Sequence, residues 1–259
     1  MKIVVIGAGN VATHLSIALL GTGHQIVQIF SKSTNSAAEL AKRIDATYTI
    51  NPAEINQLAD VYFYAVSDDA LESLLTMDIA PSAIHVHTAG SVSIDIFKDK
   101  KNKKHFGVFY PLQTFSKNKA VDFKKIPVFI ESSDKMVEDA LELLVNRIAE
   151  KSYKIDSAQR LKLHVAAVFA SNFVNHLYNI ASDLVQTTGL SFGVLKPLII
   201  ETADKINYLS PAEAQTGPAK RNDTGVINKH LEVLSESSDL EILYQMLTKM
   251  IFDKQLHQS

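Results

Sequence analysis

The chain has 259 residues, of which 46% are hydrophobic and 21% are charged, so it carries enough apolar material to bury a sizeable core. Its 26 basic and 28 acidic residues nearly cancel, which argues against nucleic acid or an anionic membrane as a partner. The lack of cysteine excludes disulfides, thiolate catalysis and cysteine-ligated metal centres, and the lack of an apolar run long enough for a signal sequence or a membrane span predicts a soluble, cytoplasmic protein.

Up to about residue 155 the chain alternates short β-branched runs with helical stretches. The predicted strands are residues 2–7, 24–31, 60–67, 83–90, 104–111, 126–133 and 151–156. The predicted helices begin near Asn10, near Asn35, at Asp68 or Asp69, and after Asp134, which suits an N-cap. Such alternation predicts an α/β domain, residues 1–155, with a Rossmann-type doubly wound parallel sheet covered by helices on both faces.

After residue 155 only helical patterns follow. Asp156 and Gln159 form a capping box, and nothing interrupts the helix until Gly189, which predicts a helix of roughly 30 residues, about 45 Å long. Further helices are predicted within 191–209 and over 225–235 and 239–253, with a loop between the first and second of these. The sequence therefore predicts a C-terminal all-helical domain, residues 156–259.

The first strand runs into a glycine-rich turn typical of dinucleotide-binding proteins. Gly7 allows a tight turn, Gly9 lets a pyrophosphate approach the backbone, and the small Ala12 lets the first helix lie close to the sheet. The helix would direct its free N–H groups and the positive end of its dipole at the phosphates. The predicted cofactor-binding residues in this turn are Gly7, Ala8, Gly9, Asn10, Val11 and Ala12.

The end of the second predicted strand distinguishes between the two nicotinamide cofactors. A carboxylate at this position would bind an adenosine ribose and repel a 2′-phosphate, but the chain has Ser31, Lys32 and Ser33 there. Hydroxyls and one cation suit a 2′-phosphate, which favours NADP(H) over NAD(H). The alternative is a solvated loop whose serines only begin the next helix.

Two further strand ends should border the same crevice, because an open α/β sheet binds ligands at the carboxyl ends of its strands. Val66 and Ser67 follow one of these strands, and His87 and Ala89 follow the next. Asp68 and Asp69 are more simply explained as helix caps. His85 and His87 face the same side of their strand, but we predict no metal site because no third ligand stands at suitable spacing.

Five segments carry a resemblance to a known family: IGAGNVATHL, HTAGS, FGVFYPLQTFS, RLKLHVAAVFASNFVNHLY and TGPAKRNDTGVINKHL. The chain resembles, over nearly its whole length, bacterial proteins with a Rossmann-like N-terminal half and a C-terminal domain of unknown function, DUF2520. More distantly it is similar to pyrroline-5-carboxylate reductase, to coenzyme F420-dependent NADP reductases and to 6-phosphogluconate dehydrogenase-like enzymes. The resemblance implies an NAD(P)-dependent oxidoreductase and names no substrate.

The chain departs from this family at two motifs. A common His-Pro-Leu reads Tyr110-Pro111-Leu112, and a common Arg-Gly-Asp reads Arg221-Asn222-Asp223. If the histidine of the first motif transfers a proton, Tyr110 would have to do so with a much higher ordinary pKa, which puts a role at this position in doubt.

The long predicted helix offers candidate catalytic residues. At 100° per residue Arg160, His164, Ser171 and Asn175 share one face, with Asn172 on its flank. In the related dehydrogenases the matching helix borders the cleft, which implies His164 as proton donor, with Ser171 and Asn172 binding polar groups of the substrate. The alternative is a histidine buried in a helix pair.

Arg221 is a fourth candidate catalytic residue, because it could pair with a substrate carboxylate or phosphate if its loop covers the cleft. Asp223 or Thr224 suits the N-cap of the next helix. An arginine in a surface loop is otherwise simply solvated.

We expect an NADP(H)-dependent oxidoreductase that transfers hydride to or from a small polar metabolite without a metal. Two alternatives remain, a non-catalytic NADP(H)-binding sensor or regulatory protein and an NADP-dependent flavin or deazaflavin reductase. We also expect a homodimer through the helical domain, because that domain presents more apolar residues than it can cover: Phe169, Phe173, Leu177, Ile180 and Leu184.

Overall fold

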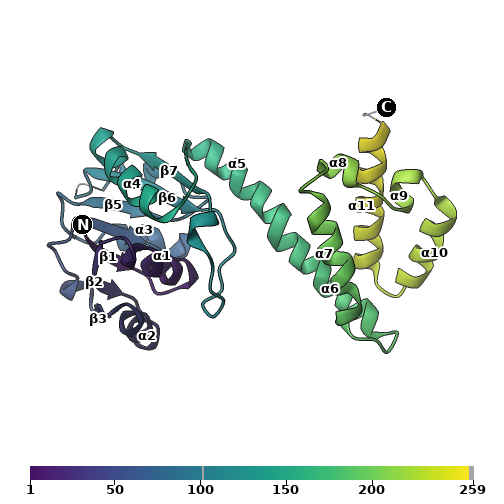
Figure 1. Cartoon of the computed structure of the whole chain (residues 1–259), viewed down its shortest axis with the longest axis horizontal. Coiled ribbons are helices and arrows are strands. Elements are labelled where there is room, and N and C mark those ends of the chain that lie inside the picture. Colours follow the sequence, from purple (N-terminus) through teal and green to yellow (C-terminus); the bar gives the residue numbers. More distant parts are fainter. Residues whose placement is uncertain (101, 257–259) are drawn as a thin grey trace. The chain divides into compact units, whose positions relative to one another are not determined.

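The computed structural model describes residues 1–100 and 102–256, and the chain divides into two compact units (Figure 1). Unit 1 is Met1–Leu177 and unit 2 is Tyr178–Ser259. The boundary expected after residue 155 marks the point where strands cease. The compact units divide further along the chain, inside the helical segment that follows.

Unit 1 is built on a mostly parallel sheet. In the described residues the strands are β1 (Lys2–Ile6), β2 (Gln25–Phe30), β3 (Thr47–Thr49), β4 (Val61–Tyr64), β5 (Ile84–His87), β6 (His105–Pro111), β7 (Val128–Ser132) and β8 (Ser152–Lys154). Their spatial order is β3-β2-β1-β4-β5-β6-β7-β8. The first six follow the 3-2-1-4-5-6 order of the Rossmann fold, which confirms the predicted fold class.

Two details of the sheet differ from the prediction. β7 runs antiparallel to β6, while every other pair is parallel. β3 was not predicted, because its three residues are too few to show an alternating pattern. The seven strands that were predicted are all present.

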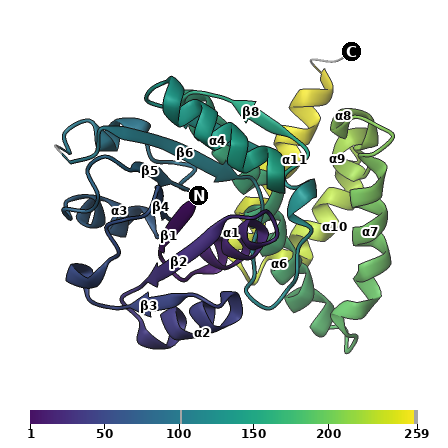
Figure 2. The ribbon, with the colours of Figure 1, turned by 60° about the vertical axis from the view of Figure 1, so that its left-hand side comes forward.

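Helices cover both faces of this sheet (Figure 2). The chain places α1 (Asn10–Leu20), α2 (Thr34–Ile44) and α4 (Lys135–Ile148) on one face, and α3 (Asp68–Leu75) with the 3₁₀ turn η2 (Ile94–Phe97) on the other. Alternate residues of β1 serve the two cores, since Ile3 and Val5 pack in the first and Val4 and Ile6 in the second. Shorter turns η1 (Pro52–Glu54) and η3 (Phe123–Lys125) lie in connections.

β1 lies at the point where the strand order reverses, between β2 and β4. The connections that follow β1 and β4 therefore diverge to opposite faces of the sheet. In open α/β sheets the ligand crevice forms at this point, outside the carboxyl ends of the strands.

The long helical segment begins as predicted and then departs from α-helical geometry. Asp156 accepts a hydrogen bond from the Gln159 backbone, and the Gln159 side chain accepts one from the Asp156 backbone, which completes the capping box. α5 (Ser157–Ala167) leads into a π-helical turn, η4 (Val168–Phe173), and then α6 (Val174–Gln186). The π-turn alters which side chains share a face, so the expectation of a regular 100° spacing fails beyond residue 167.

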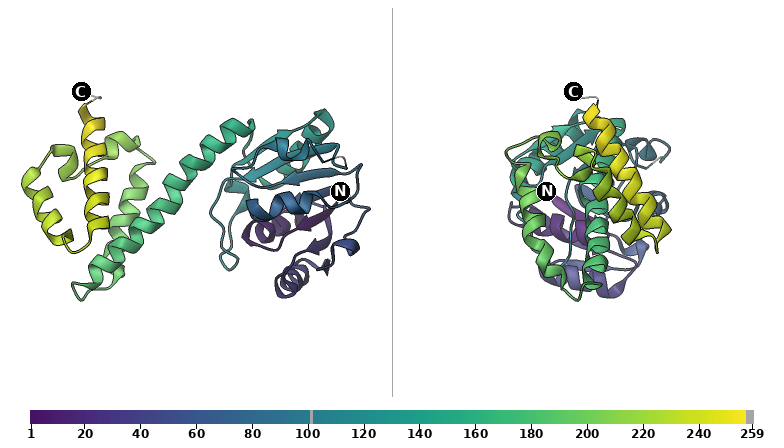
Figure 3. Two further views of the ribbon diagram at one scale, coloured as in Figure 1. Left: turned by 180° about the vertical axis from the view of Figure 1, so that it is seen from behind. Right: turned by 90° about the vertical axis from the view of Figure 1, so that its right-hand side faces the viewer.

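Unit 2 consists of helices, as predicted for the C-terminal domain. After α6 come η5 (Phe192–Leu195), α7 (Lys196–Lys205), α8 (Pro211–Ala214), α9 (Pro218–Arg221), α10 (Thr224–Leu234) and α11 (Ser238–Leu256). The expected loop thus contains two short helices, α8 and α9. Within the unit, α9 and α10 pack beside α11 (Figure 3).

Unit 2 has almost no core of its own. Among the side chains described from residue 178 to 254, Ala219 alone is buried. None of the helices among the described residues has the length and apolar character needed to cross a membrane.

Candidate functional site

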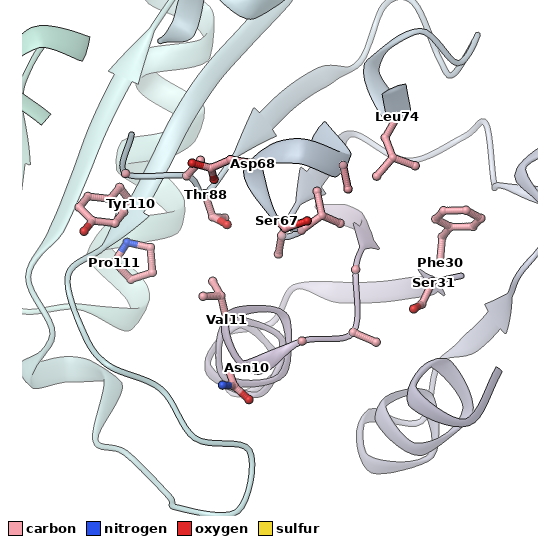
Figure 4. Close-up of a pocket in the computed structure, with 18 of the residues that line it drawn as sticks. Asn10, Val11, Phe30, Ser31, Ser67, Asp68, Leu74, Thr88, Tyr110 and Pro111 are labelled. Atoms are coloured by element: carbon pink, nitrogen blue, oxygen red, sulfur yellow. The ribbon is translucent and has the colours of Figure 1, made fainter. Parts of the chain in front are cut away.

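A cavity of about 600 Å³ lies at the carboxyl ends of β1 and β4 (Figure 4). Eleven of the residues predicted for cofactor binding or catalysis line it: Gly7, Ala8, Gly9, Asn10, Val11, Ser31, Lys32, Val66, Ser67, Ala89 and His164. Residues that were not predicted to bind the cofactor or to act in catalysis complete the wall, among them Phe30, Asp68, Thr88, Gly90, Tyr110, Pro111 and Gln113. The cavity thus collects side chains from the ends of β1, β2, β4, β5 and β6, together with α5.

The turn from β1 to α1 requires glycine at its first position. Gly7 has φ +120°, and a Cβ there would stand 2.1 Å from the Ala65 carbonyl oxygen at the end of β4. Gly9 differs, because a Cβ there would meet no atom within 4 Å. The turn therefore passes tightly over β4 at Gly7 and leaves open space in front of the helix at Gly9. Ala12 is fully buried in the core and does not line the cavity, so its contribution is to packing.

The helix that follows this turn begins without a side-chain cap. Gly9 is the N-cap of α1, no side chain accepts from the first-turn N–H groups, and the first turn holds no acidic residue. Ser67, the N-cap of α3, likewise makes no side-chain capping bond. Free N–H groups and the positive end of the α1 dipole therefore face the cavity, an arrangement suited to an anion.

The end of β2 forms the side of the cavity opposite Tyr110 and Pro111 (Figure 4). Ser31 and Lys32 line it there, and the Lys32 side chain is exposed. Ser33 does not line the cavity. Its hydroxyl caps α2 by accepting a hydrogen bond from the Ser36 backbone, so the helix-start explanation holds for this residue.

His87 does not line the cavity, contrary to expectation. Its ring is fully buried on the α3 face of the sheet and stacks on Phe97 with ring centroids 5.7 Å apart. Burial lowers the pKa of His87 to about 3, with a contribution from Arg160, so the ring is neutral. Its Nδ1 accepts a hydrogen bond from the Ala89 N–H at 3.2 Å, and His87 thereby supports the turn that brings Ala89 to the cavity.

Asp68 is not the N-cap of α3, which is Ser67. Asp68 lies in the first turn of the helix and accepts a hydrogen bond from the Ser91 hydroxyl. Within residues 1–100 and 102–256, no three potential metal ligands come together.

A second cavity of about 630 Å³ adjoins the first and shares five lining residues with it: Asn10, Val11, Tyr110, Gln113 and His164. Ser171 and Asn172 line only this second cavity. Asn175, which an α-helix would place on the same face as Ser171, does not line it. The π-turn between Val168 and Phe173 changes the angular spacing of the side chains, so the α-helical relation between Ser171 and Asn175 does not apply across it.

Tyr110 and His164 meet where the two cavities join. The Tyr110 hydroxyl lies 3.0 Å from Nδ1 of His164, and the two ring planes are inclined at 70° with centroids 6.0 Å apart. Burial raises the pKa of Tyr110, and the positive charge of Arg160 opposes this rise. Sequence reasoning left position 110 in doubt, and no local signal could reveal a contact between residues 54 positions apart.

Arg160 lies one turn before His164 and anchors α5 rather than lining a cavity. Its guanidinium is buried, with an ion pair to Glu131 of β7 and hydrogen bonds to the Val92 carbonyl and the Ser157 hydroxyl. The Ser157 hydroxyl also donates to Glu131. These contacts hold the start of α5 against the sheet, and with it the position of His164.

Arg221 belongs to unit 2, where it ends α9 with an exposed side chain. Asn222 follows in the left-handed conformation, φ 54°, which asparagine tolerates better than most residues and glycine adopts freely. Asn222 therefore has a backbone conformation that glycine also adopts at such a position. Asp223 caps α10 by accepting from the Val226 N–H, as the simpler explanation required. A substrate-binding role for Arg221 stays a prediction.

Two family models match the chain. Residues 2–96 match the family described as "NADP oxidoreductase coenzyme F420-dependent", and residues 126–251 match "Domain of unknown function (DUF2520)". No match was found among curated proteins.

Solved structures resemble the whole chain. A protein of Bacteroides fragilis described as a "putative NADP oxidoreductase" is 43% identical, with a TM-score of 0.92 and coverage of 97% of this chain and 98% of that chain. A 1-pyrroline-5-carboxylate reductase of Streptococcus pyogenes is 13% identical, with a TM-score of 0.65 and 98% coverage of both chains. A reductive aminase of Aspergillus terreus in complex with NADPH and ethyl-5-oxohexanoate is 13% identical, with a TM-score of 0.74 and coverage of 98% and 94%. The last two similarities establish the fold alone.

Proposed function

Because this chain belongs to the family that joins an N-terminal NADP oxidoreductase domain to a C-terminal DUF2520 domain, we propose that it is a cytoplasmic, NADP(H)-dependent oxidoreductase acting on a small polar metabolite. The observation that carries the proposal is the glycine turn after β1. There an uncapped helix and the open space at Gly9 face a cavity at the reversal point of the sheet. These features fit a diphosphate held by backbone N–H groups.

The cofactor would lie along the first cavity, with its adenosine end toward Ser31 and Lys32 and its nicotinamide end toward Val66, Ser67 and Ala89. Lys32 supports a 2′-phosphate, because it lines the cavity and the described residues bordering the cavity at the end of β2 include no carboxylate. NADP(H) would supply or accept a hydride when bound.

His164 is the proposed proton donor or acceptor, because it lines both cavities and its Nε2 has no hydrogen-bond partner among the described residues. The second cavity is the proposed substrate site. Ser171 and Asn172 can bind polar groups of the substrate there, and Phe115 and Val168 exclude water. No metal takes part in this scheme.

We further propose that the protein is a homodimer through its helical domain. The expected apolar flank is largely exposed, with Phe169 at 61%, Phe173 at 49% and Leu177 at 39%. Unit 2 buries only Ala219 among its described side chains. A helical unit without a core needs a partner that covers its apolar surface. A second copy of the chain presents the same apolar surface, and the two surfaces can cover each other across a two-fold axis.

Titration calorimetry with NADPH and NADH tests the cofactor. We expect NADPH to bind at least about tenfold more tightly than NADH, because one charge-assisted hydrogen bond to the 2′-phosphate changes the affinity by that factor. Lys32→Ala should remove that preference, whereas Lys42→Ala, which alters an exposed lysine of α2 outside the cavity, should keep it. Equal affinities in the unaltered protein would contradict the assignment of NADP(H).

Stopped-flow oxidation of bound NADPH tests the chemistry, with pyruvate, cyclohexanone, 1-pyrroline and FMN as acceptors. Turnover of a carbonyl or imine supports the proposal, and His164→Ala should abolish it while nucleotide affinity stays unchanged. Turnover of FMN alone would identify a flavin reductase. Binding without turnover of any acceptor would favour a nucleotide sensor.

A further inference from the structure

We propose that Tyr110 and His164 form a two-residue proton relay, in which His164 protonates the substrate and Tyr110 replaces the proton through Nδ1. The relay rests on the proposed function of the site and assigns Tyr110 as a positioning and proton-supplying residue.

The geometry brings the two groups into direct contact from different parts of the fold. Tyr110 comes from the end of β6 and His164 from α5, and their hydroxyl and Nδ1 are 3.0 Å apart. Both side chains line both cavities. The pair therefore stands between the proposed sites of the cofactor and the substrate.

The relay requires the Tyr110 hydroxyl to be the donor in this contact. Among the described residues, that hydroxyl has Nδ1 of His164 as its one hydrogen-bond partner. When the hydroxyl donates, Nδ1 of the neutral ring accepts and the proton resides on Nε2. Nε2–H is then available to a substrate oxygen or nitrogen.

The relay conserves atoms and charge in the direction of reduction. The Nε2–H bond breaks as the proton passes to the substrate oxygen or nitrogen that gains charge on hydride transfer. At the same time the Tyr110 O–H bond breaks and an Nδ1–H bond forms, so the imidazole stays neutral. The resulting tyrosinate accepts a hydrogen bond from Nδ1–H. The relay is reset when Nε2 takes a proton from water and Nδ1–H returns its proton to the tyrosinate.

Burial raises the pKa of Tyr110, while the charge of Arg160 lowers it, so the phenol keeps its proton at neutral pH. Charged groups surround the pair on several elements. Arg160 of α5 is ion-paired with Glu131 of β7, Asp68 of α3 lines the first cavity together with the pair, and Lys32 lines the same cavity at the end of β2. The buried ring of His87 on β5 is neutral because its pKa is lowered to about 3.

Nitrogen NMR of the full-length protein with ¹⁵N-labelled histidine tests the contact without any substrate. The His164 signal is identified by its loss in His164→Gln. At pH 8 with NADPH bound, we expect a proton on Nε2 and a hydrogen-bonded, unprotonated Nδ1. In Tyr110→Phe we expect a mixture of His164 tautomers. The control is Tyr48→Phe, which alters an exposed tyrosine of β3 and should leave the His164 signal unchanged. A proton on Nδ1 in the unaltered protein, or an unchanged His164 signal in Tyr110→Phe, overturns the relay.

The pH profile of NADPH oxidation, measured with the fastest acceptor of the panel above, tests the proton transfer. A histidine acting alone loses its proton near pH 6.5, whereas a phenol keeps its own to about pH 10. We expect a flat profile from pH 6.5 to 8.5 in the unaltered protein and in Tyr48→Phe. In Tyr110→Phe we expect kcat to fall about tenfold per pH unit over this range, with KM nearly unchanged.

An unchanged profile in Tyr110→Phe overturns the relay even where nucleotide binding and turnover are normal. A lack of NADPH binding, or of turnover with every acceptor, instead contradicts the proposed function. In that case the same NMR measurement, made without nucleotide, decides whether Tyr110 controls the proton of His164.

Discussion

The backbone of Gly90 lies against the imidazole of His164, so closely that a Cβ at position 90 would stand 2.6 Å from Nδ1. The same Cβ would lie 2.9 Å from Cζ of Tyr110. The loop after β5 therefore closes onto the Tyr110–His164 contact only with glycine at this position.

We expect Gly90→Ala to separate Tyr110 from His164 and to lower turnover at least about tenfold, because the added Cβ forces the imidazole to move and proton transfer depends on the length and alignment of the contact. The matched control is Gly21→Ala, where a Cβ meets no atom within 4 Å. Turnover is measured with the acceptor panel, and His164 is followed by its ¹⁵N signal. A Gly90→Ala protein with full turnover would show that this close approach is unnecessary.

The two glycines of the β1–α1 turn should respond oppositely to alanine. At Gly7 a Cβ would collide with the Ala65 carbonyl oxygen, and the backbone conformation there is unfavourable to alanine. Gly7→Ala should therefore lower the free energy of unfolding by ~2 kcal/mol or more. At Gly9 the Cβ has room, and stability should be unchanged or slightly higher.

Gly9→Ala should nevertheless weaken nucleotide binding at least about tenfold, because its methyl group occupies the space through which a diphosphate approaches the N–H groups of α1. Urea unfolding and calorimetry with NADPH separate the two effects. Normal NADPH affinity in a well-folded Gly9→Ala protein would argue against a diphosphate at this turn.

The buried histidines of β5 should make stability depend on pH. Burial lowers the pKa of both His85 and His87 to about 3 in the folded protein, against about 6.5 in the unfolded chain. Between these values the unfolded state binds more protons, so stability is complete above pH 6.5 and falls as the pH drops toward 3. Each histidine contributes about 1.4 kcal/mol per pH unit.

Urea unfolding between pH 7.5 and 5 checks this dependence above the range in which most carboxylates titrate. His85→Phe should reduce the slope by about half, whatever its effect on absolute stability. His176→Gln, at an exposed position of α6, should leave the slope unaltered. A slope that His85→Phe does not change would mean that this ring is protonated in the folded protein.

The exposed apolar flank predicts self-association. Light scattering at micromolar concentration should give twice the 28.5 kDa mass of one chain. The double variant Phe169→Glu, Phe173→Glu should dissociate, because a dimer would have to bury the added charges. Leu58→Glu, which changes an 81% exposed residue of unit 1, should remain dimeric. A monomeric mass for the unaltered protein would refute the dimer.

Local chemistry allowed most of the elements to be predicted. Strands rich in β-branched residues, the capping box at Asp156 and the glycine turn after β1 each depend on neighbours within a few positions, so their signals lie in short stretches of chain. The same holds for the ends of β2 and β4, whose residues line the first cavity as expected.

Tertiary structure decided what depends on distant partners. The short β3 forms because β2 offers it an edge, β7 runs antiparallel through its pairing with β6, and the helical segment after α5 takes π geometry over Val168–Phe173. Ser33 and His87 were expected to bind the cofactor but do not line the cavity, because Ser33 caps a helix and His87 packs in the core. The sequence by itself determined a nucleotide-binding fold with a helical domain. Only folding joined Tyr110 to His164, because long-range packing brings together groups whose proximity no short stretch of sequence encodes.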